Sequence, residues 1–464
     1  MKKNKIITPW NINEALLSLI PCDAYKLVHR LMYPKDIKNI YLTYTARGSK
    51  NNEYSDIAWN HLFVKNVINK IFNDFVHYVV LLSKENEKGS ITKTLQKKLT
   101  NVFSVKNFSN DFILCLKKLG KSIEITKKLP IVVKAHKTSD HVPFQSCLMT
   151  ITGLKGINPE FIWLINFFET VILENIWQFN TSLTIARNYY ELVTEYARLS
   201  STNMDFVKYQ CHDFSMRGMS SLWSSIYSGS AHLMYFDGSD TIIAGDNAKS
   251  VFASEHSVMS IDGQEKEFDT YKRLLTKFPN GPLSLVSDTW NIWNILDNVL
   301  PKLKKDIIQR NGKLIIRPDS GDPDEIICGK KNFSWKNKKT WGVIHYLDYH
   351  FGSKLNKKGF KELNPKVGII YGDAITYKIT ESILKNLVKQ KYSSNNIIFG
   401  IGGTTYQATT RDTLGFVSKV TSVYRPNSQN KNVWLNVEKN PITDNSKKSL
   451  TGRFTKNKNL IQIY

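Results

Sequence analysis

The chain has 464 residues, which is enough for two domains or for one barrel with a large elaboration. Hydrophobic residues make up 41% and aromatic residues 12%, values that are ordinary for a globular protein and exclude disorder on a large scale. The formal net charge of +24 has two interpretations, a lysine-rich solvated surface or attraction to a polyanion, either nucleic acid or a small polyphosphate. We favour the solvated surface, because the basic residues are spread through many segments.

The N-terminal and apolar segments favour a cytoplasmic protein that does not act in a membrane. The first residues, MKKNK, could begin a signal peptide, but Asn11, Asn13 and Glu14 interrupt the apolar run that should follow. The segment from Phe161 to Trp177 is apolar but contains two asparagines and two glutamates, so it predicts a buried helix. The cysteines are far apart and form no CxxC pair, which favours a reducing compartment and argues against a disulfide framework or a zinc ribbon. They are Cys22, Cys115, Cys147, Cys211 and Cys328.

The pattern of elements changes near residue 210. Before it, extended segments such as Ile40–Thr45 and Ile131–Lys134 are scattered among long helical patterns such as Leu183–Leu199. After it, short apolar strands recur, and small or acidic residues follow each one. The predicted strands are Leu283–Val286, Leu314–Ile316, Val367–Tyr371 and Ile397–Phe399, and helical spacing follows the third at Ile379, Ile383, Leu384 and Leu387.

Strand, polar turn and helix in repetition predict a parallel βα array. An open doubly wound sheet would show the same local pattern. We favour a barrel, because every strand end carries polar chemistry rather than only those at one switch point.

Acidic residues stand just beyond three of the strands, at Asp288, Asp319 and Asp373. A single Asp after a strand is often only a helix N-cap. Several together, with Arg317 and glycines, predict a polar pocket suited to a sugar phosphate with bound magnesium. Carboxylates would bind ribose hydroxyls and the metal, and arginine would bind phosphate.

Three further segments are ambiguous when taken alone. Glycines in FGIGGTTYQATTRD (Phe399 to Asp412) could offer backbone N–H groups to phosphate or only make a tight turn. His256, beside Glu255 in SVFASEHS, is a catalytic candidate or simply a packed or surface histidine, and it forms no metal motif. The segment KKNFSWKNKKTW, from Lys330 to Trp341, alternates bases and aromatics as single-strand binders do, or is a surface insertion.

Taken together, the motifs resemble the nicotinamide phosphoribosyltransferases in order and spacing. The resemblance also reaches CDAYK (Cys22 to Lys26) and the lysine-rich end from Lys439 to Arg453, so it covers nearly the whole chain. The motifs that carry it are HDFSMRG (His212 to Gly218), GSAHLMYFDGSDT (Gly229 to Thr241), SVFASEHS (Ser250 to Ser257), PLSLVSDTW (Pro282 to Trp290), LIIRPDSGDP (Leu314 to Pro323), YGDA (Tyr371 to Ala374) and FGIGGTTYQATTRD.

This resemblance implies a fold, a reaction and an assembly. The fold is the irregular (β/α) barrel of the type II phosphoribosyltransferases over residues 206–411, with an α+β domain built from residues 1–205 and the returning segment 412–464. The reaction transfers phosphoribosyl from phosphoribosyl pyrophosphate (PRPP) to nicotinamide in NAD salvage, giving nicotinamide mononucleotide and pyrophosphate. It would use Mg²⁺, with ATP hydrolysis coupled through a phosphohistidine. The assembly is a homodimer with shared active sites.

The resemblance also assigns roles around the pyridine ring. Phe214 would stack on one face, and Tyr25 of the other subunit would stack on the opposite face. Asp240 would accept the carboxamide N–H, and Ser284 and Asp288 belong to the substrate-binding set.

Other residues are assigned to catalysis and to the sugar phosphate. His256 matches the histidine that ATP phosphorylates, Arg317 would reach substrate oxygens, and Asp319 would lie near the reacting ribose. The remaining residues would hold hydroxyls, phosphates or charge at the dimer interface. They are Gly372 and Asp373 for the ribose, Gly402 and Gly403 for the 5′-phosphate, Arg217 for the pyrophosphate, and Arg411, Lys419, Lys439 and Lys447 for the interface. The residues that would hold magnesium are not assigned.

The chain departs from the family pattern at three places. Ala24 replaces a serine, Ser215–Met216 replace Gly-Tyr, and Thr404 replaces a third glycine. The second departure could reshape the pocket wall and the third could alter phosphate affinity. Two alternatives to this function are a nicotinate phosphoribosyltransferase, which Asp240 disfavours because it would repel the carboxylate of nicotinate, and a basic nucleic-acid-binding protein.

Overall fold

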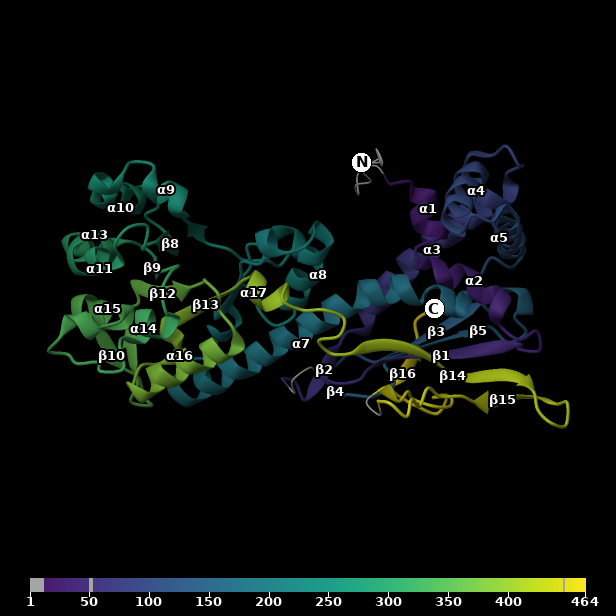
Figure 1. The fold of residues 1–464 in the computed structure, drawn as a ribbon. Helices are drawn as coiled ribbons and strands as arrows, with labels where there is room; N and C mark the ends of the chain where they lie inside the picture. Colours follow the sequence, from purple (N-terminus) through teal and green to yellow (C-terminus); the bar gives the residue numbers. More distant parts are fainter. Residues whose placement is uncertain (1–11, 50–52, 445–446) are drawn as a thin grey trace. The chain divides into compact units, whose positions relative to one another are not determined.

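The computed structural model describes residues 12–49, 53–444 and 447–464, so the segment MKKNK lies outside the described residues. The chain forms two compact units. Unit 1 comprises Met1–Thr181 and Thr410–Tyr464, and unit 2 comprises Ser182–Thr409. The boundary between Thr181 and Ser182 falls inside the long helix α7 (Glu169–Ser200), which Figure 1 shows in blue-green.

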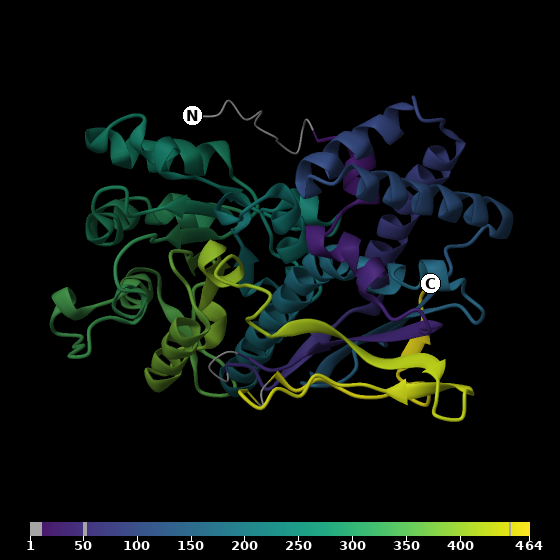
Figure 2. The ribbon, with the colours of Figure 1, turned by 45° about the vertical axis from the view of Figure 1, so that its right-hand side comes forward.

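Unit 1 contains a six-stranded antiparallel sheet in the order β15-β14-β1-β5-β3-β16. The two strands predicted at Ile40–Thr45 and Ile131–Lys134 are confirmed. The C-terminal segment completes the sheet, because β14 pairs with β1 and β16 pairs with β3; in Figure 2 the yellow β14 runs beside the purple β1. The strands are β1 (Asn39–Ala46), β3 (Ile131–His136), β5 (Met149–Gly153), β14 (Phe416–Pro426), β15 (Asn432–Asn436) and β16 (Leu460–Gln462).

Helices cover the apolar face of this sheet. The longest of those wholly within unit 1, α3, begins after Asn60, whose side chain accepts the N–H groups of Leu62 and Phe63. Its buried residues recur at helical spacing, so one stripe enters the core. The other elements of the unit are α1 (Glu14–Leu19), α2 (Ala24–Met32), α3 (His61–Lys84), α4 (Ser90–Phe103), α5 (Lys106–Thr126), α6 (Leu164–Phe167) and the two-stranded sheet of β2 (Asp56–Trp59) and β4 (Ser139–Pro143).

The segment from Phe161 to Trp177 is largely buried and mostly helical, as predicted. It forms two helices, α6 and the start of α7, rather than one. Across the described part of the chain, no helix combines the length and the apolar character needed to cross a membrane.

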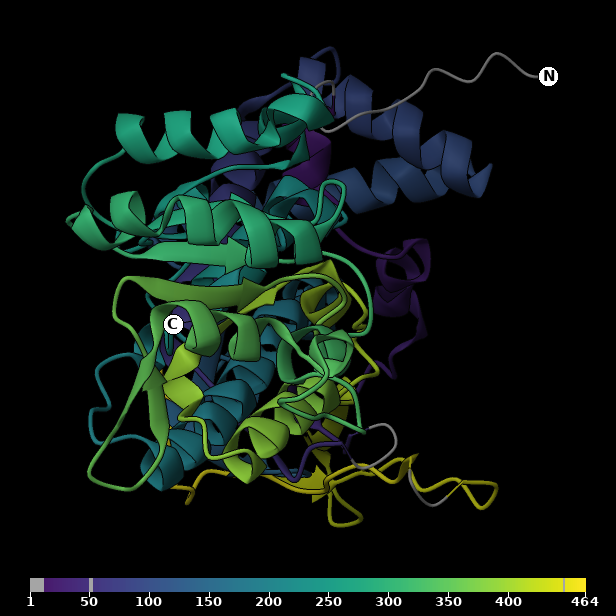
Figure 3. The ribbon, with the colours of Figure 1, turned by 90° about the vertical axis from the view of Figure 1, so that its left-hand side faces the viewer.

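Unit 2 contains a six-stranded parallel sheet in the order β6-β13-β12-β9-β8-β7. The four strands predicted from short apolar runs are confirmed as β8, β9, β12 and β13. The helices of the unit lie around this sheet (Figure 3). The strands are β6 (Cys211–Asp213), β7 (Phe252–Ala253), β8 (Leu283–Val286), β9 (Leu314–Arg317), β12 (Val367–Tyr371) and β13 (Ile397–Ile401).

Isolated bridges join the two edges of the parallel sheet. Asp213 in β6 bridges to Ser239, and the adjacent Gly238 bridges to Lys249, which leads into β7. The sheet therefore curls into an irregular barrel rather than an open doubly wound sheet, as predicted. Between β6 and β7 the described residues form only these isolated bridges, not a continuous ladder of strand hydrogen bonds.

The helices of unit 2 include the one predicted from Ile379 to Leu387, which is α16. Its residues Ile383, Leu384 and Leu387 are buried. The elements beside the barrel are α8 (Leu222–His232), α9 (His256–Ser260), α10 (Glu267–Lys277), α11 (Ile292–Asn294), α12 (Leu300–Lys302), α13 (Lys304–Gln309), α14 (Pro323–Cys328), α15 (Val343–Phe351), α16 (Tyr377–Lys389), α17 (Gly403–Tyr406), β10 (Ser353–Leu355) and β11 (Lys361–Leu363).

The basic and aromatic segment from Lys330 to Trp341 packs against its own unit. Trp341 is buried, and the ring of Phe333 stacks on His345 with centroids 3.9 Å apart. Lys338 forms an ion pair with Asp297 at 2.6 Å. These rings and this charge are therefore largely engaged in internal contacts, which favours the interpretation as an insertion.

Candidate active site

A cavity of about 390 Å³ lies at the carboxyl ends of the parallel strands of unit 2. Side chains that follow β6, β9, β12 and β13 reach it together, because the carboxyl ends of parallel strands meet at one face of a barrel. Nine residues predicted as site residues line it. They are Phe214, Arg217, Asp240, Arg317, Asp319, Gly372, Asp373, Gly402 and Gly403.

The ring of Phe214 is fixed against the strand ends. Its backbone N–H donates to the carbonyl of Ile401 at 2.8 Å, and the guanidinium of Arg317 lies 5.5 Å from the ring centroid. A Cβ on Gly400 would lie only 2.6 Å from the ring, and one on Gly372 would lie 3.4 Å from it. The absence of side chains at these glycines therefore lets the ring pack directly on β13 and the end of β12. A ring held in this way offers a rigid stacking surface to a flat ligand.

Asp240 is held as an anion by neighbours on one of its oxygens. Its Oδ1 accepts from Nε2 of His212 at 3.0 Å and from the hydroxyl of Ser250. Burial opposes the charge, but these two hydrogen bonds and the nearby charges of His212 and Arg317 outweigh burial and lower the pKa of Asp240. Because both bonds fall on Oδ1, Oδ2 remains as an acceptor at the cavity.

Arg317, Asp319 and His256 form a chain of ionisable groups at the end of β9. Oδ2 of Asp319 lies 3.9 Å from an Nη of Arg317 and 3.9 Å from Nε2 of His256. These separations are within ion-pair range but too long for hydrogen bonds. The Nδ1 atom of His256 lies 3.1 Å from the hydroxyl of Thr289. His256 itself does not line the cavity. Asp319 does line it and lies next to His256, so it links the histidine to the cavity.

Asp288 and Ser284 lie behind the cavity rather than on its wall. Oδ2 of Asp288 accepts the backbone N–H of Asp319 at 3.0 Å and the hydroxyl of Ser320, so Asp288 positions the loop that carries Asp319. Oδ1 of Asp288, Oγ of Ser284 and Nε of Arg317 are buried and have no hydrogen-bond partner among the described residues. Unpaired buried polar atoms are uncommon in proteins, so their accumulation here is typical of a site that receives a polar ligand.

The carboxylates fit a magnesium ion that arrives with a phosphate substrate. Among the described residues no group of three or more histidine, cysteine or acidic side chains could hold a metal alone. Mg²⁺, however, is usually held by only one or two carboxylates together with substrate phosphates and water. Asp319 at the cavity and the unpaired Oδ1 of Asp288 behind it match that requirement.

Glycines form part of the cavity wall. Gly218 and Gly403 face one another so closely that a Cβ on either would lie 3.2 Å from the Cα of the other. Gly402 precedes α17, and Gly403 begins it. The first N–H groups of a helix have no partner within the helix, so this wall offers backbone donors to an anion. Ala374, which follows Asp373, has a left-handed φ of +50°, a strained conformation typical of functional loops.

Six residues on the cavity wall were not predicted as site residues. Two of them, Met216 and Thr404, are positions where the sequence departs from the family pattern, which was a usable signal. Glu255 adjoins His256, and Gly218 and Ala374 end the motifs HDFSMRG and YGDA. The full set is Met216, Gly218, Thr241, Glu255, Ala374 and Thr404.

The other five predicted residues belong to unit 1. Tyr25 is 56% exposed on α2, and its hydroxyl donates to Asp23. Lys419 lies on β14, where burial lowers its pKa and the charge of Glu169 opposes that effect, while Lys439, Lys26 and Arg47 lower the pKa further. Two of the five are paired locally with acids, Arg411 with Asp412 at 2.8 Å and Lys447 with Asp444 at 3.1 Å. Lys419 and Lys439 are thus close enough to interact.

The curled parallel barrel, with a polar cavity at its strand ends, is the fold of the type II phosphoribosyltransferases. The structure of nicotinate-nucleotide pyrophosphorylase from Pyrococcus furiosus is similar, with a TM-score of 0.50 over 91% of this chain and 79% of that one. At 14% identity this likeness concerns the fold alone. The sequence pattern of the nicotinate phosphoribosyltransferase (NAPRTase) family matches residues 209–463. The chain belongs to this family.

Relatives similar over nearly the full length carry a more specific name. A protein named nicotinamide phosphoribosyltransferase from Mycoplasma pneumoniae is 50% identical over 98% of this chain and 99% of its own length. A protein of the same name from Mycoplasma genitalium is 47% identical over 97% of each chain. The membership predicted from the motifs is confirmed.

Proposed function

We propose that the chain is a nicotinamide phosphoribosyltransferase, which transfers phosphoribosyl from PRPP to nicotinamide and releases pyrophosphate. The observation that carries the proposal is the cavity at the barrel's strand ends, where an aromatic surface, an anionic acceptor, a guanidinium and exposed backbone donors converge. The names of the full-length relatives support nicotinamide as the base.

The base is held by Phe214 and Asp240. The pyridine ring stacks on Phe214, and the carboxamide N–H donates to Oδ2 of Asp240. Because His212 and Ser250 keep Asp240 ionised, the carboxylate of nicotinate would face a like charge at this position. This repulsion disfavours the alternative of a nicotinate phosphoribosyltransferase.

The transfer step depends on position and charge. The pyridine nitrogen carries a free electron pair, so it attacks the anomeric carbon without a general base, and the C–O bond to pyrophosphate breaks with its electron pair on the leaving oxygen. Positive charge develops on the ribose, and the carboxylate of Asp319 stabilises it. Arg317 and the backbone donors of Gly402 and Gly403 hold phosphate oxygens. Asp319 and Asp288 would hold Mg²⁺, which would supply neutralising charge for the pyrophosphate.

Product analysis tests this function. The purified protein with PRPP, Mg²⁺ and nicotinamide should form nicotinamide mononucleotide and pyrophosphate in equal amounts, measured by mass spectrometry and a pyrophosphate assay. Asp319→Asn should reduce the rate by a factor of about 100 or more, since it removes charge at the reacting centre. Asp269→Asn, at an exposed position on α10, is the matched control. No mononucleotide from the unmodified protein would refute the proposal.

We further propose that ATP hydrolysis is coupled to this reaction through phosphorylation of His256. Support comes from its position, because its ring lies 3.9 Å from Asp319 without entering the substrate cavity. In the phosphorylation step the imidazole nitrogen bonds to the γ-phosphorus of ATP, and ADP leaves with the electron pair of the broken bond. Water later breaks the N–P bond and gives inorganic phosphate.

Labelling with γ-³²P-ATP tests the role of His256. The unmodified protein and His77→Ala, which changes an exposed histidine on α3, should form an acid-labile phosphoenzyme. His256→Ala should form none, yet should still make nicotinamide mononucleotide slowly without ATP, because the transfer needs no histidine. A phosphoenzyme from His256→Ala would show that another residue accepts the phosphate.

In this proposal the active form is a homodimer, and the protein is cytoplasmic. Tyr25 is an exposed aromatic residue in unit 1, and Lys419 and Lys439 form a cationic group there, so each could complete the cavity of another subunit. The five cysteines are free thiols, as is typical of a reducing compartment.

A further inference from the structure

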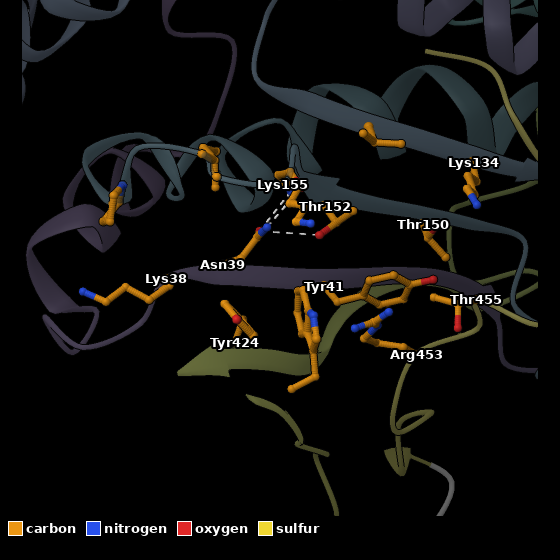
Figure 4. Close-up of a pocket in the computed structure, with 16 residues that line it drawn as sticks. Lys38, Asn39, Tyr41, Lys134, Thr150, Thr152, Lys155, Tyr424, Arg453 and Thr455 are labelled. Carbon is orange, nitrogen blue, oxygen red and sulfur yellow. Dashed lines mark hydrogen bonds between the residues drawn. The ribbon is translucent and has the colours of Figure 1, made fainter. Parts of the chain in front are cut away.

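A second cavity, of about 550 Å³, lies in unit 1 and shares no residue with the candidate active site. Its floor is the face of the antiparallel sheet that points away from the core. Asn39 and Tyr41 of β1 line it and alternate with the core residues Ile40 and Leu42. On β3, Lys134 lines it and alternates with buried neighbours in the same way. Figure 4 shows these side chains projecting into the cavity.

Three aromatic rings form one wall. Trp434 on β15 pairs with Tyr424 on β14, and their ring centroids are 5.4 Å apart. The edge of Tyr41 meets Trp434 at 6.2 Å with an interplanar angle of 84°. The hydroxyl of Tyr41 accepts the backbone N–H of Phe454 at 3.3 Å. Because strand pairing fixes all three rings, the wall is preformed.

Four cations surround the rings. They are Lys38, Lys134, Lys155 and Arg453, and the described residues that line the cavity include no carboxylate. None of the four takes part in an ion pair among the described residues. The guanidinium of Arg453 lies 4.6 Å from the centroid of Trp434. The positive charge at this cavity is therefore uncompensated, unlike that of Lys338 or Lys361, each of which contacts an aspartate.

The register of the sheet spreads these charges along the aromatic wall. Lys134 on β3 pairs with Thr150 on β5, and Thr150 pairs with Thr43 on β1. Lys134 is therefore level with Thr43, which lies five residues beyond Lys38 along the chain. At the rise of a β-strand this separation is about 17 Å along the sheet. In Figure 4 Lys38 and Lys134 lie on either side of Tyr41. A ligand would thus meet rings at the centre and cations towards both ends.

We propose that this cavity binds a nucleoside diphosphate or triphosphate, with the base against the aromatic wall and the phosphates on Lys134 and Lys155. Its volume falls within the range of small-molecule sites, about 300–1,000 Å³. Cations alone would suit any polyanion, but the rings add a preference for a base, since every nucleobase has a flat face that stacks on an aromatic side chain. A site of this kind also gives a role to part of the excess positive charge of the chain.

Photolabelling with 8-azido-ADP locates the site. Irradiation should attach the label to the peptide that contains Tyr424 or Trp434, and peptide mass spectrometry identifies it. Excess ADP should prevent this labelling, whereas adenosine or pyrophosphate at the same concentration should prevent it far less. Label confined to peptides of unit 2 would overturn the proposal, and so would equal protection by pyrophosphate, which would mean that the rings play no part.

Charge variants test the same site by ADP titration. Lys155→Gln changes an exposed residue, and Lys134→Gln changes a half-buried one on β3. Together they should weaken the labelled site's affinity for ADP at least about tenfold, because two charge-assisted contacts are lost. Lys137→Gln is the matched control, since Lys137 is exposed just beyond β3 and does not line the cavity. Should Lys134→Gln fail to fold, Lys155→Gln alone should still weaken binding; unchanged affinity in a folded variant would contradict the proposal.

Discussion

At the scale of single residues, the proposed choice of base depends on one oxygen of Asp240. His212 and Ser250 both occupy Oδ1, so these neighbours fix the orientation of the carboxylate and keep it charged. In the proposed site, we expect Asp240 to select by repulsion as well as by attraction, because nicotinate differs from nicotinamide at the group that Oδ2 would meet.

Asp240→Asn should narrow the preference for nicotinamide. The amide oxygen of the new asparagine can still accept from His212, while its NH₂ group puts a donor where the acceptor Oδ2 was. Loss of the charged hydrogen bond should cost nicotinamide about 1.5–3 kcal/mol in kcat/KM, and nicotinate should gain. Steady-state kinetics with each base measures both effects. Asp246→Asn, an exposed acid nearby, should leave the ratio unchanged; the same ratio in Asp240→Asn would mean that Asp240 does not contact the base.

A buried acid on α10 gives the stability of unit 2 a dependence on pH. Burial raises the pKa of Glu267 from 4.5 to about 7, although a hydrogen bond with Asn294 opposes the shift. The folded state therefore favours the neutral carboxyl. Its contribution to stability is fully present below pH 4.5 and is lost as the pH rises through 7.

Glu267→Gln should remove this dependence. At pH 8 the variant should be more stable than the unmodified protein by about 1–3 kcal/mol, and at pH 4.5 the two should be nearly equal. Thermal unfolding midpoints across this pH range test the prediction. Glu265→Gln, which changes an exposed acid two residues before the start of α10, should follow the unmodified protein. A variant that loses stability with rising pH as the unmodified protein does would contradict the shifted pKa.

At the scale of elements, the strand ends of the barrel depend on glycines that have no side chain to clash. Gly400 is the most constrained of them, because a Cβ there would lie 2.6 Å from the Phe214 ring and 2.7 Å from the Cα of Gly372. The backbone of one strand end and the stacking residue therefore share the space that a methyl group would fill.

Gly400→Ala should disturb both the fold and the binding of the base. Overpacking typically costs about 1–3 kcal/mol, so the unfolding midpoint should fall, and displacement of Phe214 should raise KM for nicotinamide more than KM for PRPP. Gly402→Ala is the stability control, because its Cβ would meet nothing within 4 Å. An unchanged midpoint and KM in Gly400→Ala would show that the ring is not held as described.

Strong local patterns made most strands of the barrel predictable from sequence, but not its closure. Val367–Tyr371 matches β12 residue for residue, because a fully buried strand is a continuous apolar run. β6 and β7 have three and two residues, too few for any periodicity. The bridges at Gly238 and Ser239 depend on contacts between distant segments and leave no local pattern.

The site was predictable for a different reason. Nine of its residues were assigned from motifs whose order matches a family, whereas composition and spacing alone left Asp319, Asp373 and the glycines ambiguous. Met216 and Thr404 on the cavity wall interrupt that match, and Glu255 was noticed only as the neighbour of His256. The hydrogen bond from His212 to Asp240 could not be foreseen, because 28 residues and a helix separate the two.

At the scale of the whole molecule, the predicted functional residues divide between the two units. Phe214, Arg317 and Asp319 lie in unit 2, whereas Tyr25, Arg411 and the interface lysines lie in unit 1. The C-terminal segment adds three strands to the N-terminal sheet, a pairing across more than 300 residues that no local pattern reveals. In the proposed dimer each site takes its unit 1 residues from the other subunit.

Subunit complementation tests this sharing. Arg411→Ala damages the contributed part and Asp319→Ala the resident part, so each variant alone should be nearly inactive. After mixing and exchange, about half the dimers should be mixed, each with one intact site of two, and activity should recover to about a quarter of the unmodified level. Exchange can be followed by native mass spectrometry. No recovery despite exchange, or full activity from a monomer, would place the complete site within one chain.

The most direct test of the proposed function is a competition between the two bases in one reaction. The purified protein is supplied with PRPP, Mg²⁺, ATP and equal concentrations of nicotinamide and nicotinate, and the mononucleotides are separated by mass spectrometry during the first turnovers. An ionised Asp240 beside the pyridine site predicts nicotinamide mononucleotide as the dominant product. Nicotinate mononucleotide in equal or greater amount would contradict the account.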